Sequence, residues 1–137
     1  TTDRFSVKGE RKMRRRLTSS FGYAFEGIKY VLKTQPNMKI HSVIGLFAIL
    51  AGFFFKISEA EWLAIVIVIG FVLILEVVNT AVETLVDLYT EEYHHLAKVS
   101  KDTAAGAVLL MAIVSVVVGL IIFLPKIWAM IAPLIFK

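Results

Sequence analysis

The chain has 137 residues, a length typical of one domain, and 58% of them are hydrophobic while only 19% are charged. Soluble domains are about 45–50% apolar, so this excess, which is gathered in long runs, predicts a membrane protein. There is no cysteine and the net charge is +4, which excludes a disulfide framework, thiolate metal sites and cysteine nucleophiles, and the composition excludes a secreted mini-protein, a coiled coil and a disordered tail.

The N-terminal third combines a basic segment with an amphipathic pattern. Ten of the fifteen Lys and Arg residues lie before residue 40, and residues 1–16 form the basic segment. Over residues 17–34 apolar side chains recur every three or four positions, which predicts a helix with one apolar stripe. We expect this helix to lie on the membrane surface with its basic groups toward anionic headgroups; a soluble helix packed on a partner is the alternative. The stripe consists of Leu17, Phe21, Phe25, Ile28 and Leu32.

Three apolar runs follow, and a helix needs roughly 20 residues to cross a bilayer. They predict membrane helices over residues 38–55, 62–89 and 103–124. We expect Pro125 to end the third helix, because proline cannot continue the helical hydrogen-bond ladder. The apolar tail, residues 125–137, is too short to span and contains Pro133, so we expect it to lie at the membrane surface or to be poorly ordered. The sequence therefore predicts one all-α integral membrane domain, residues 1–137.

The distribution of basic residues predicts the orientation. Their excess before the first membrane helix places the N-terminus in the cytoplasm. Three crossings then put the loop at residues 56–61 outside, the loop at residues 89–102 in the cytoplasm and the C-terminus outside. No small-residue cleavage site follows the first apolar run, so we expect a multi-pass protein of the cell membrane without a cleavable signal peptide.

A polar stripe in the second membrane helix is the most informative feature. At about 100° per residue, four polar side chains fall within an arc of roughly 80°. A carboxylate at membrane depth costs on the order of 2.5–3.5 kcal/mol, so the stripe should face a bundle interior, a cation or water. Carboxylates can hold magnesium together with phosphate oxygens, or act as a general base; a purely structural network is the alternative. The four residues are Glu76, Asn79, Glu83 and Asp87.

A mixed-charge cluster continues the stripe at the predicted cytoplasmic end. Such a cluster at headgroup level can bind a phosphate group, and a solvated loop is the alternative. The adjacent His94 and His95 point about 100° apart on a helix and do not form a zinc motif. Neither GxxxxGK[ST] nor GxGxxG occurs, so no soluble nucleotide-binding fold is indicated; residue chemistry alone leaves a transporter, a channel and an enzyme open. The cluster consists of Glu91, Glu92, His94, His95, Lys98, Lys101 and Asp102.

These residues belong to a longer pattern that resembles the prokaryotic diacylglycerol kinase family. The pattern is EVVNTAVETLVD at 76–87, EYH at 92–94 and AKVSKD at 97–102. Residues 21–41 look like the Gram-positive branch, which consists mostly of undecaprenol kinases, and the whole resemblance covers about residues 18–124. It implies a Gram-positive bacterial protein and a homotrimeric helix bundle. Each protomer would have three membrane helices and one surface helix, with active sites shared between neighbours.

The resemblance also implies a reaction. The γ-phosphoryl group of magnesium ATP would pass to undecaprenol and give undecaprenyl phosphate; diacylglycerol, giving phosphatidic acid, is the close alternative. By motif position Glu76 would be the general base and Glu83 a magnesium ligand. Gln35 stands where many members have a glutamate that binds a second magnesium ion, and its amide oxygen can ligate without adding charge. The residues implied to contact ATP or its metal are Asn79, Asp87, Glu92, Lys101 and Asp102.

Two other classes stay open on the sequence. A small cation or proton transporter would suit the stripe, although the paired repeats and broken helices typical of transporters are not visible. A structural membrane protein without chemistry is the other. For the kinase we expect the lipid alcohol, ATP from the cytoplasm, Mg²⁺ and two further copies of the chain as partners, and no nucleic acid.

Overall fold

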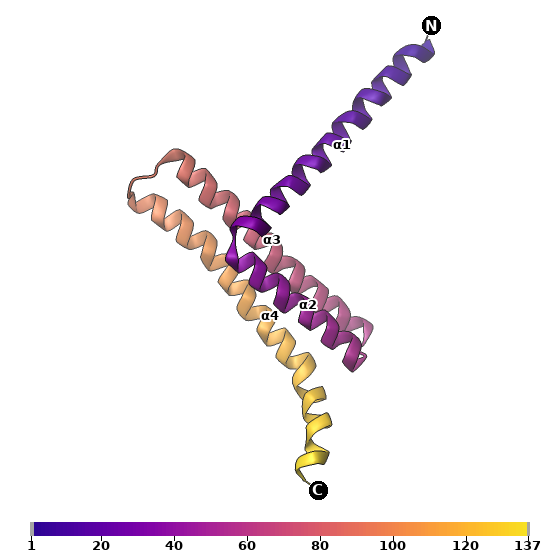
Figure 1. Ribbon diagram of the computed structural model, residues 1–137, viewed down its shortest axis with the longest axis vertical. Coiled ribbons are helices and arrows are strands. Elements are labelled where there is room, and N and C mark those ends of the chain that lie inside the picture. The colour runs from indigo at the N-terminus through magenta and orange to yellow at the C-terminus, as the bar shows by residue number, and fades with distance from the viewer. Residues whose placement is uncertain (1, 137) are drawn as a thin grey trace. The chain divides into compact units, whose positions relative to one another are not determined.

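The computed structural model describes residues 2–136, and side chains from residue 12 onward. Over this range it contains four α-helices and no strand (Figure 1): α1 (Thr2–Thr34), α2 (Pro36–Phe55), α3 (Glu59–Tyr89) and α4 (His95–Ile135). Helices α2, α3 and α4 are long and apolar enough to cross a membrane. This confirms the predicted all-α fold with three membrane helices.

Helix α1 forms a unit of its own, separate from the unit that begins at Gln35. It is a single helix of 33 residues, so the helix predicted over residues 17–34 extends back through the basic segment. Lys and Arg have good helix propensity, which explains why the basic segment continues the helix. The apolar stripe of this helix, including Phe21 and Phe25, is exposed. That this helix lies on a membrane surface stays a prediction. That residues 1–137 form a single membrane domain stays a prediction as well.

The second unit is a bundle in which α4 packs along α3 more extensively than α2 does. The buried core lies toward the end where α2 and α3 are joined. It consists of Ile57, Ile65 and Ile122, packed against Phe55, Trp62, Ala64, Ile69, Val118 and Phe123.

The turn between α2 and α3 is tightly built. Lys56 ends α2 in the left-handed region at φ 50°, and its N–H bonds back to carbonyls of the last turn. Ser58 then starts α3 with a capping box: its hydroxyl accepts from the Glu61 N–H, and the Glu61 carboxylate accepts from the Ser58 N–H. A Cβ on Gly52 would lie 2.7 Å from the Trp62 ring, so this close approach of α2 to α3 requires glycine.

Helix α4 differs from its prediction. It begins at His95 and continues through Pro125 to Ile135, so the prediction that Pro125 ends the helix and that a separate tail follows is wrong up to Ile135. Proline removes one backbone hydrogen bond and bends a helix, but it does not prevent the next turn from forming. Apolar residues on both sides favour the helix, because a backbone in lipid must satisfy its own hydrogen bonds.

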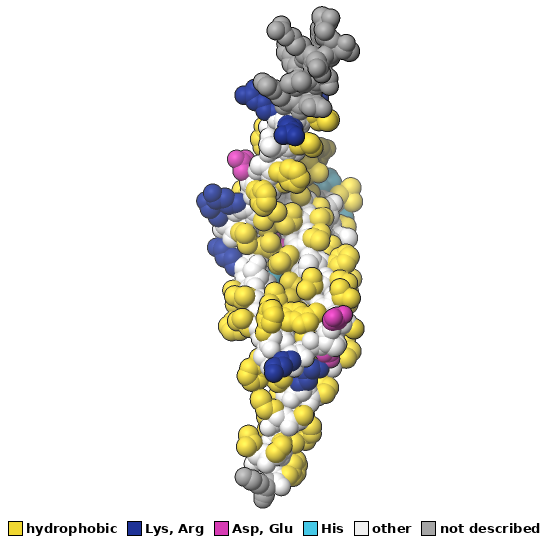
Figure 2. Space-filling view, turned by 90° about the vertical axis from the view of Figure 1, so that its right-hand side faces the viewer, with side chains coloured by type: hydrophobic (Ala, Val, Ile, Leu, Met, Phe, Trp, Pro, Cys, Tyr) yellow, Lys and Arg dark blue, Asp and Glu magenta, His cyan; other side chains and the backbone are white. Residues whose placement is uncertain are grey.

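The outside of the bundle is largely apolar. Figure 2 shows hydrophobic side chains over most of the visible face of the α2–α4 unit. Large exposed residues occur on all three helices, among them Phe47, Phe53, Leu63, Ile74 and Leu110. Contiguous apolar surface of this extent is typical of a surface that faces lipid or a partner.

Candidate active site

A small polar cavity of about 200 Å³ lies among α2, α3 and α4. Helix α2 contributes Asn37 and His41, which are one helical turn apart and therefore share a face. Helix α3 contributes the first two members of the polar stripe. The wall supplied by α4 is apolar and is formed by Ala105, Val108, Leu109 and Ala112.

Glu76 is the most buried polar residue of the cavity, with 1% of its surface exposed. Neither of its carboxylate oxygens has a hydrogen-bond partner among the described residues, and the same holds for Asn79 Oδ1. The nearest basic group is the imidazole of His41, whose Nε2 lies 3.5 Å from Glu76 Oε1. Buried polar atoms in proteins are nearly always paired, so unpaired oxygens that line a cavity indicate a site for a ligand.

Glu83 lies one turn beyond Asn79 and receives two amide groups. Asn79 Nδ2 donates to Glu83 Oε1 at 3.1 Å, and Gln35 Nε2 donates to Glu83 Oε2 at 3.5 Å. Gln35 is the N-cap of α2, but its side chain makes no capping bond; it crosses to α3 instead. The structure therefore brings Gln35, Asn79 and Glu83 together, with the Gln35 amide nitrogen toward the carboxylate.

A second group of charged residues lies where α3 and α4 are joined, in a pocket of about 340 Å³. Lys101 Nζ pairs with Asp87, and Lys98 pairs with Asp102 one turn along α4. Glu92 lies in the connecting loop and lines the same pocket. Asp87 follows Glu76 by eleven residues, or about 16 Å of helix at about 1.5 Å per residue. The predicted site residues thus form two clusters, one around Glu76 and Glu83 of α3 and one around Asp87, near the junction of α3 and α4.

The donor atoms decide which metal the cavity suits. Over the described side chains, no group of three or more His, Asp or Glu residues is placed to hold a metal ion. What the site offers is hard oxygen: the carboxylates of Glu76 and Glu83 and the unpaired amide oxygen of Asn79. Magnesium commonly uses one or two carboxylates and takes its other ligands from phosphate and water. The residues fit a magnesium ion that arrives with a phosphate-bearing substrate.

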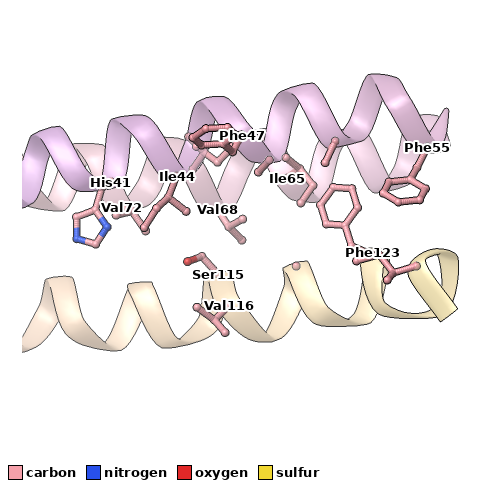
Figure 3. A pocket seen from close by; sticks show the side chains of 16 residues that line it. His41, Ile44, Phe47, Phe55, Ile65, Val68, Val72, Ser115, Val116 and Phe123 are labelled. Carbon is pink, nitrogen blue, oxygen red and sulfur yellow. The ribbon is translucent and has the colours of Figure 1, made fainter. Parts of the chain in front are cut away.

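An apolar groove of about 400 Å³ adjoins the polar cavity, and the sequence did not predict it. It is lined by all three membrane helices. Figure 3 shows His41 at one end of the groove and Phe55 and Phe123 toward the other. Ser115 is the other polar residue in its lining. Because His41 lines both the groove and the cavity, the two spaces meet at this side chain.

Sequence reasoning missed Asn37 and His41 as members of the site. Both lie before or at the start of an apolar run, where polar residues normally mark a helix end at the membrane surface. The available signal was their spacing of four residues, which places both on one face of α2. That spacing alone does not say which face meets Glu76, because the register between two helices is set by packing along their whole length.

Comparisons with known proteins agree with the pattern of the site. A family model described as "Prokaryotic diacylglycerol kinase" matches residues 22–123. An undecaprenol kinase of Bacillus subtilis is 41% identical over 119 residues, which cover 87% of this chain and 97% of the relative. A diacylglycerol kinase of Synechocystis is 43% identical over 110 residues, covering 80% of the chain and 63% of that longer relative. A diacylglycerol kinase of Escherichia coli is 26% identical over 102 residues, covering 74% and 84%.

Proposed function

The chain belongs to the prokaryotic diacylglycerol kinase family, and from that membership we propose that it is a lipid kinase that transfers the γ-phosphoryl group of ATP to undecaprenol. The product is undecaprenyl phosphate. The observation that carries the proposal is the position of Glu76, buried and unpaired, where the polar cavity meets the apolar groove at His41. The similarity to the Bacillus subtilis undecaprenol kinase over nearly its whole length favours undecaprenol. The diacylglycerol kinases among the relatives make diacylglycerol the second candidate.

The proposed step needs a base within reach of the lipid hydroxyl. Glu76 accepts the hydroxyl proton while the lipid oxygen forms a bond to the γ-phosphorus. The bond from that phosphorus to the bridging oxygen breaks, and ADP leaves with the electron pair. A carboxylate with two unpaired oxygens and little contact with water is well suited to this role, since no protein donor competes with the substrate hydroxyl.

Glu83 and Asn79 are proposed to hold magnesium. When bound, the ion neutralises negative charge spread over the phosphate oxygens, which is the main requirement of phosphoryl transfer. The Gln35 amide nitrogen faces Glu83, so we assign Gln35 the role of orienting that carboxylate rather than of ligating metal. The Asn79 amide nitrogen also donates to Glu83, which leaves the Asn79 oxygen free for the ion or the nucleotide.

The charged cluster between α3 and α4 is proposed to bind ATP from the cytoplasm. Lys101 supplies a cation for the phosphates, and its pairing with Asp87 positions the ammonium group at the pocket. Glu92 and Asp102 are assigned to the nucleotide as well. The common face of α3 allows a nucleotide held at this cluster to direct its phosphates toward Glu83.

The apolar groove is proposed to hold the hydrocarbon chain of the lipid alcohol. A chain that lies in the groove with its hydroxyl at His41 brings that hydroxyl to Glu76. The reacting group then never has to leave the membrane. In this arrangement the two substrates reach the site from different sides. The lipid comes from the groove, and ATP comes from the charged cluster at the other end of the stripe.

We further propose that the enzyme works as a homotrimer in the cell membrane of a Gram-positive bacterium. The bundle exposes large apolar side chains on all three helices, which would pack against neighbouring protomers, and a neighbour would complete the site. The N-terminus and the α3–α4 loop face the cytoplasm, as the excess of basic residues before α2 favours. The segment at residues 17–34 lies on the cytoplasmic membrane surface, and the chain acts as one membrane domain.

The reaction is tested by transfer of labelled γ-phosphate from ATP in detergent–lipid micelles. Undecaprenol and diacylglycerol are compared at equal mole fraction, with and without magnesium. We expect magnesium-dependent labelling of undecaprenol that exceeds that of diacylglycerol at least tenfold. The reverse preference would support a lipid kinase whose substrate is diacylglycerol. Labelling of neither lipid by a well-folded protein, together with cation uptake into liposomes without ATP, would favour a transporter.

A further inference from the structure

The last part of α4 lies beyond the length that a membrane helix requires. Residues 103–124 carry no charge and extend about 33 Å at about 1.5 Å per residue, which already crosses a hydrocarbon core of about 30 Å. Helix α4 nevertheless continues to Ile135. The family model matches residues 22–123, so this continuation lies outside the residues that the model matches.

An ion pair fixes the level at which the continuation begins. Lys126 Nζ lies 2.6 Å from Glu61 Oε1, and both side chains are partly exposed. Glu61 belongs to the capping box that starts α3, next to the α2–α3 turn. Lys126 therefore lies at the same membrane face as that turn, where charged groups can reach water.

From residue 127 to residue 136 the chain is apolar on every side. Residues 127–136, which we name the C-terminal segment, read IWAMIAPLIF and contain no polar side chain. Trp128, Leu134 and Phe136 are all more than half exposed. An amphipathic helix with one side toward water would have a polar face, and this segment has none. Its apolar surface also continues from the exposed Ile121 and Leu124 of the membrane-spanning part.

The direction of the segment changes near Pro125. Figure 1 shows that the yellow end of α4 turns away from the line of the rest of the helix, and Pro125 and Pro133 both lie inside α4. A proline kink lets a helix leave the direction of the bundle without losing its backbone hydrogen bonds elsewhere. Trp128 follows two residues after the ion pair, at the depth where tryptophan is enriched in membrane proteins.

We propose that the C-terminal segment is a membrane anchor that lies in the lipid at the face where α2 and α3 are joined. Lipid is favoured over a second copy of the chain because the segment continues the apolar surface of a membrane helix. It also has no Ser, Thr, Asn, Gln or His, the residues that typically form hydrogen bonds between membrane helices. The Lys126–Glu61 pair holds the start of the anchor at the headgroup level, and Trp128 marks the same level. The proposal does not depend on the kinase reaction.

The experiment uses Trp128 as its probe, since the chain has only two tryptophans, Trp62 and Trp128. The variant Trp62→Phe is reconstituted as the full chain into phosphatidylcholine vesicles that carry bromine at the headgroup end or the methyl end of the acyl chains. We expect bromine near the headgroup to quench more than half of the fluorescence, and more than bromine near the methyl end. Aqueous acrylamide should quench several-fold less than it quenches free tryptophan. Trp128→Phe, which leaves Trp62 as the reporter, is the matched control.

Two results would overturn the proposal. Strong quenching by acrylamide with little quenching by bromine would place Trp128 in water. Protection from both quenchers would show that protein covers the segment, as a second copy of the chain would. The substitution Leu134→Cys gives an independent measurement in which Trp62 is retained. The chain has no other cysteine, so a spin label attaches at this position alone. A spin label there should be several-fold more accessible to oxygen than to a water-soluble nickel complex, and the reverse order would contradict the anchor.

Discussion

His41 Nε2 lies 3.5 Å from Glu76 Oε1, across the contact between α2 and α3. The imidazole lines the apolar groove on one side and the polar cavity on the other. Glu76 has no hydrogen-bond partner among the described residues, so His41 is the basic group best placed to meet both the carboxylate and a lipid hydroxyl. In the proposed reaction His41 is a positioning residue, which keeps the hydroxyl at the base.

Replacing His41 by alanine should therefore slow the reaction of the lipid. A hydrogen bond to an uncharged hydroxyl contributes about 0.5–1.5 kcal/mol, so kcat/KM for undecaprenol should fall about 2- to 10-fold. KM for ATP should change little, because ATP is bound at the other cluster. Steady-state kinetics with each substrate varied in turn measures the two effects. His95→Gln, at the start of α4 and outside the cavity, is the control; an equal rise in both KM values would contradict the assignment of His41.

The magnesium requirement should depend on Glu83. The substitution Glu83→Gln removes the carboxylate that the proposed metal site contains, so the magnesium concentration for half-maximal activity should rise about tenfold or more. Gln35→Glu adds a carboxylate next to Glu83, and it should shift the same midpoint to lower concentration. Titration of activity with magnesium at saturating ATP gives both midpoints. A midpoint that neither substitution moves would place the metal elsewhere.

Filling the apolar groove should weaken binding of the lipid. Gly119 lines the groove, and a Cβ at this position would meet no atom within 4 Å, so a side chain added there can extend into the groove. Gly119→Leu should raise KM for undecaprenol about tenfold and leave KM for ATP unchanged. Gly70→Leu is the matched control, because Gly70 also has open space around it but does not line the groove. If Gly119→Leu retained the KM of the unmodified chain, the hydrocarbon chain would have to lie elsewhere.

Gly52 is predicted to matter for stability. A methyl group there would lie 2.7 Å from the Trp62 ring and 3.0 Å from the Ile57 side chain, and overpacking of this kind costs about 1–3 kcal/mol. Gly52→Ala should therefore lower the melting temperature in detergent. Gly70→Ala, in open space within α3, should keep or raise it, because alanine is the better helix former by about 1 kcal/mol. A melting temperature that Gly52→Ala left unchanged would mean that the α2–α3 contact can open without loss.

Much of the fold follows from periodicity and length. The three membrane helices are recognisable because each apolar run is long enough to cross a bilayer, and the stripe from Glu76 to Asp87 follows from the helical repeat alone. Pro125 shows the limit of such rules. Proline disfavours a helix locally, but the apolar environment on both sides of it favours the helix over a longer range, and the sequence does not rank the two effects.

The site could be predicted along α3 but not between helices. Glu76, Asn79 and Glu83 share a face in any α-helix, whatever its neighbours do. The contacts of Gln35 with Glu83 and of His41 with Glu76 depend on how far α2 is shifted along α3. That shift is set by side-chain packing such as the approach of Gly52 to Trp62. The apolar groove has the same origin, since three helices must be placed before the space between them is defined.

The role of Glu76 as the base is the central claim, and Glu76→Gln tests it most directly. The amide has nearly the same shape and removes a buried charge, so the protein should fold as before or be more stable. Loss of general base catalysis should lower the rate of phosphoryl transfer to undecaprenol about 10²- to 10⁴-fold, while binding of magnesium ATP is retained. Loss of a base should cost far more than about threefold in rate. If the variant binds ATP and still phosphorylates undecaprenol within about threefold of the unmodified rate, Glu76 has only a structural role.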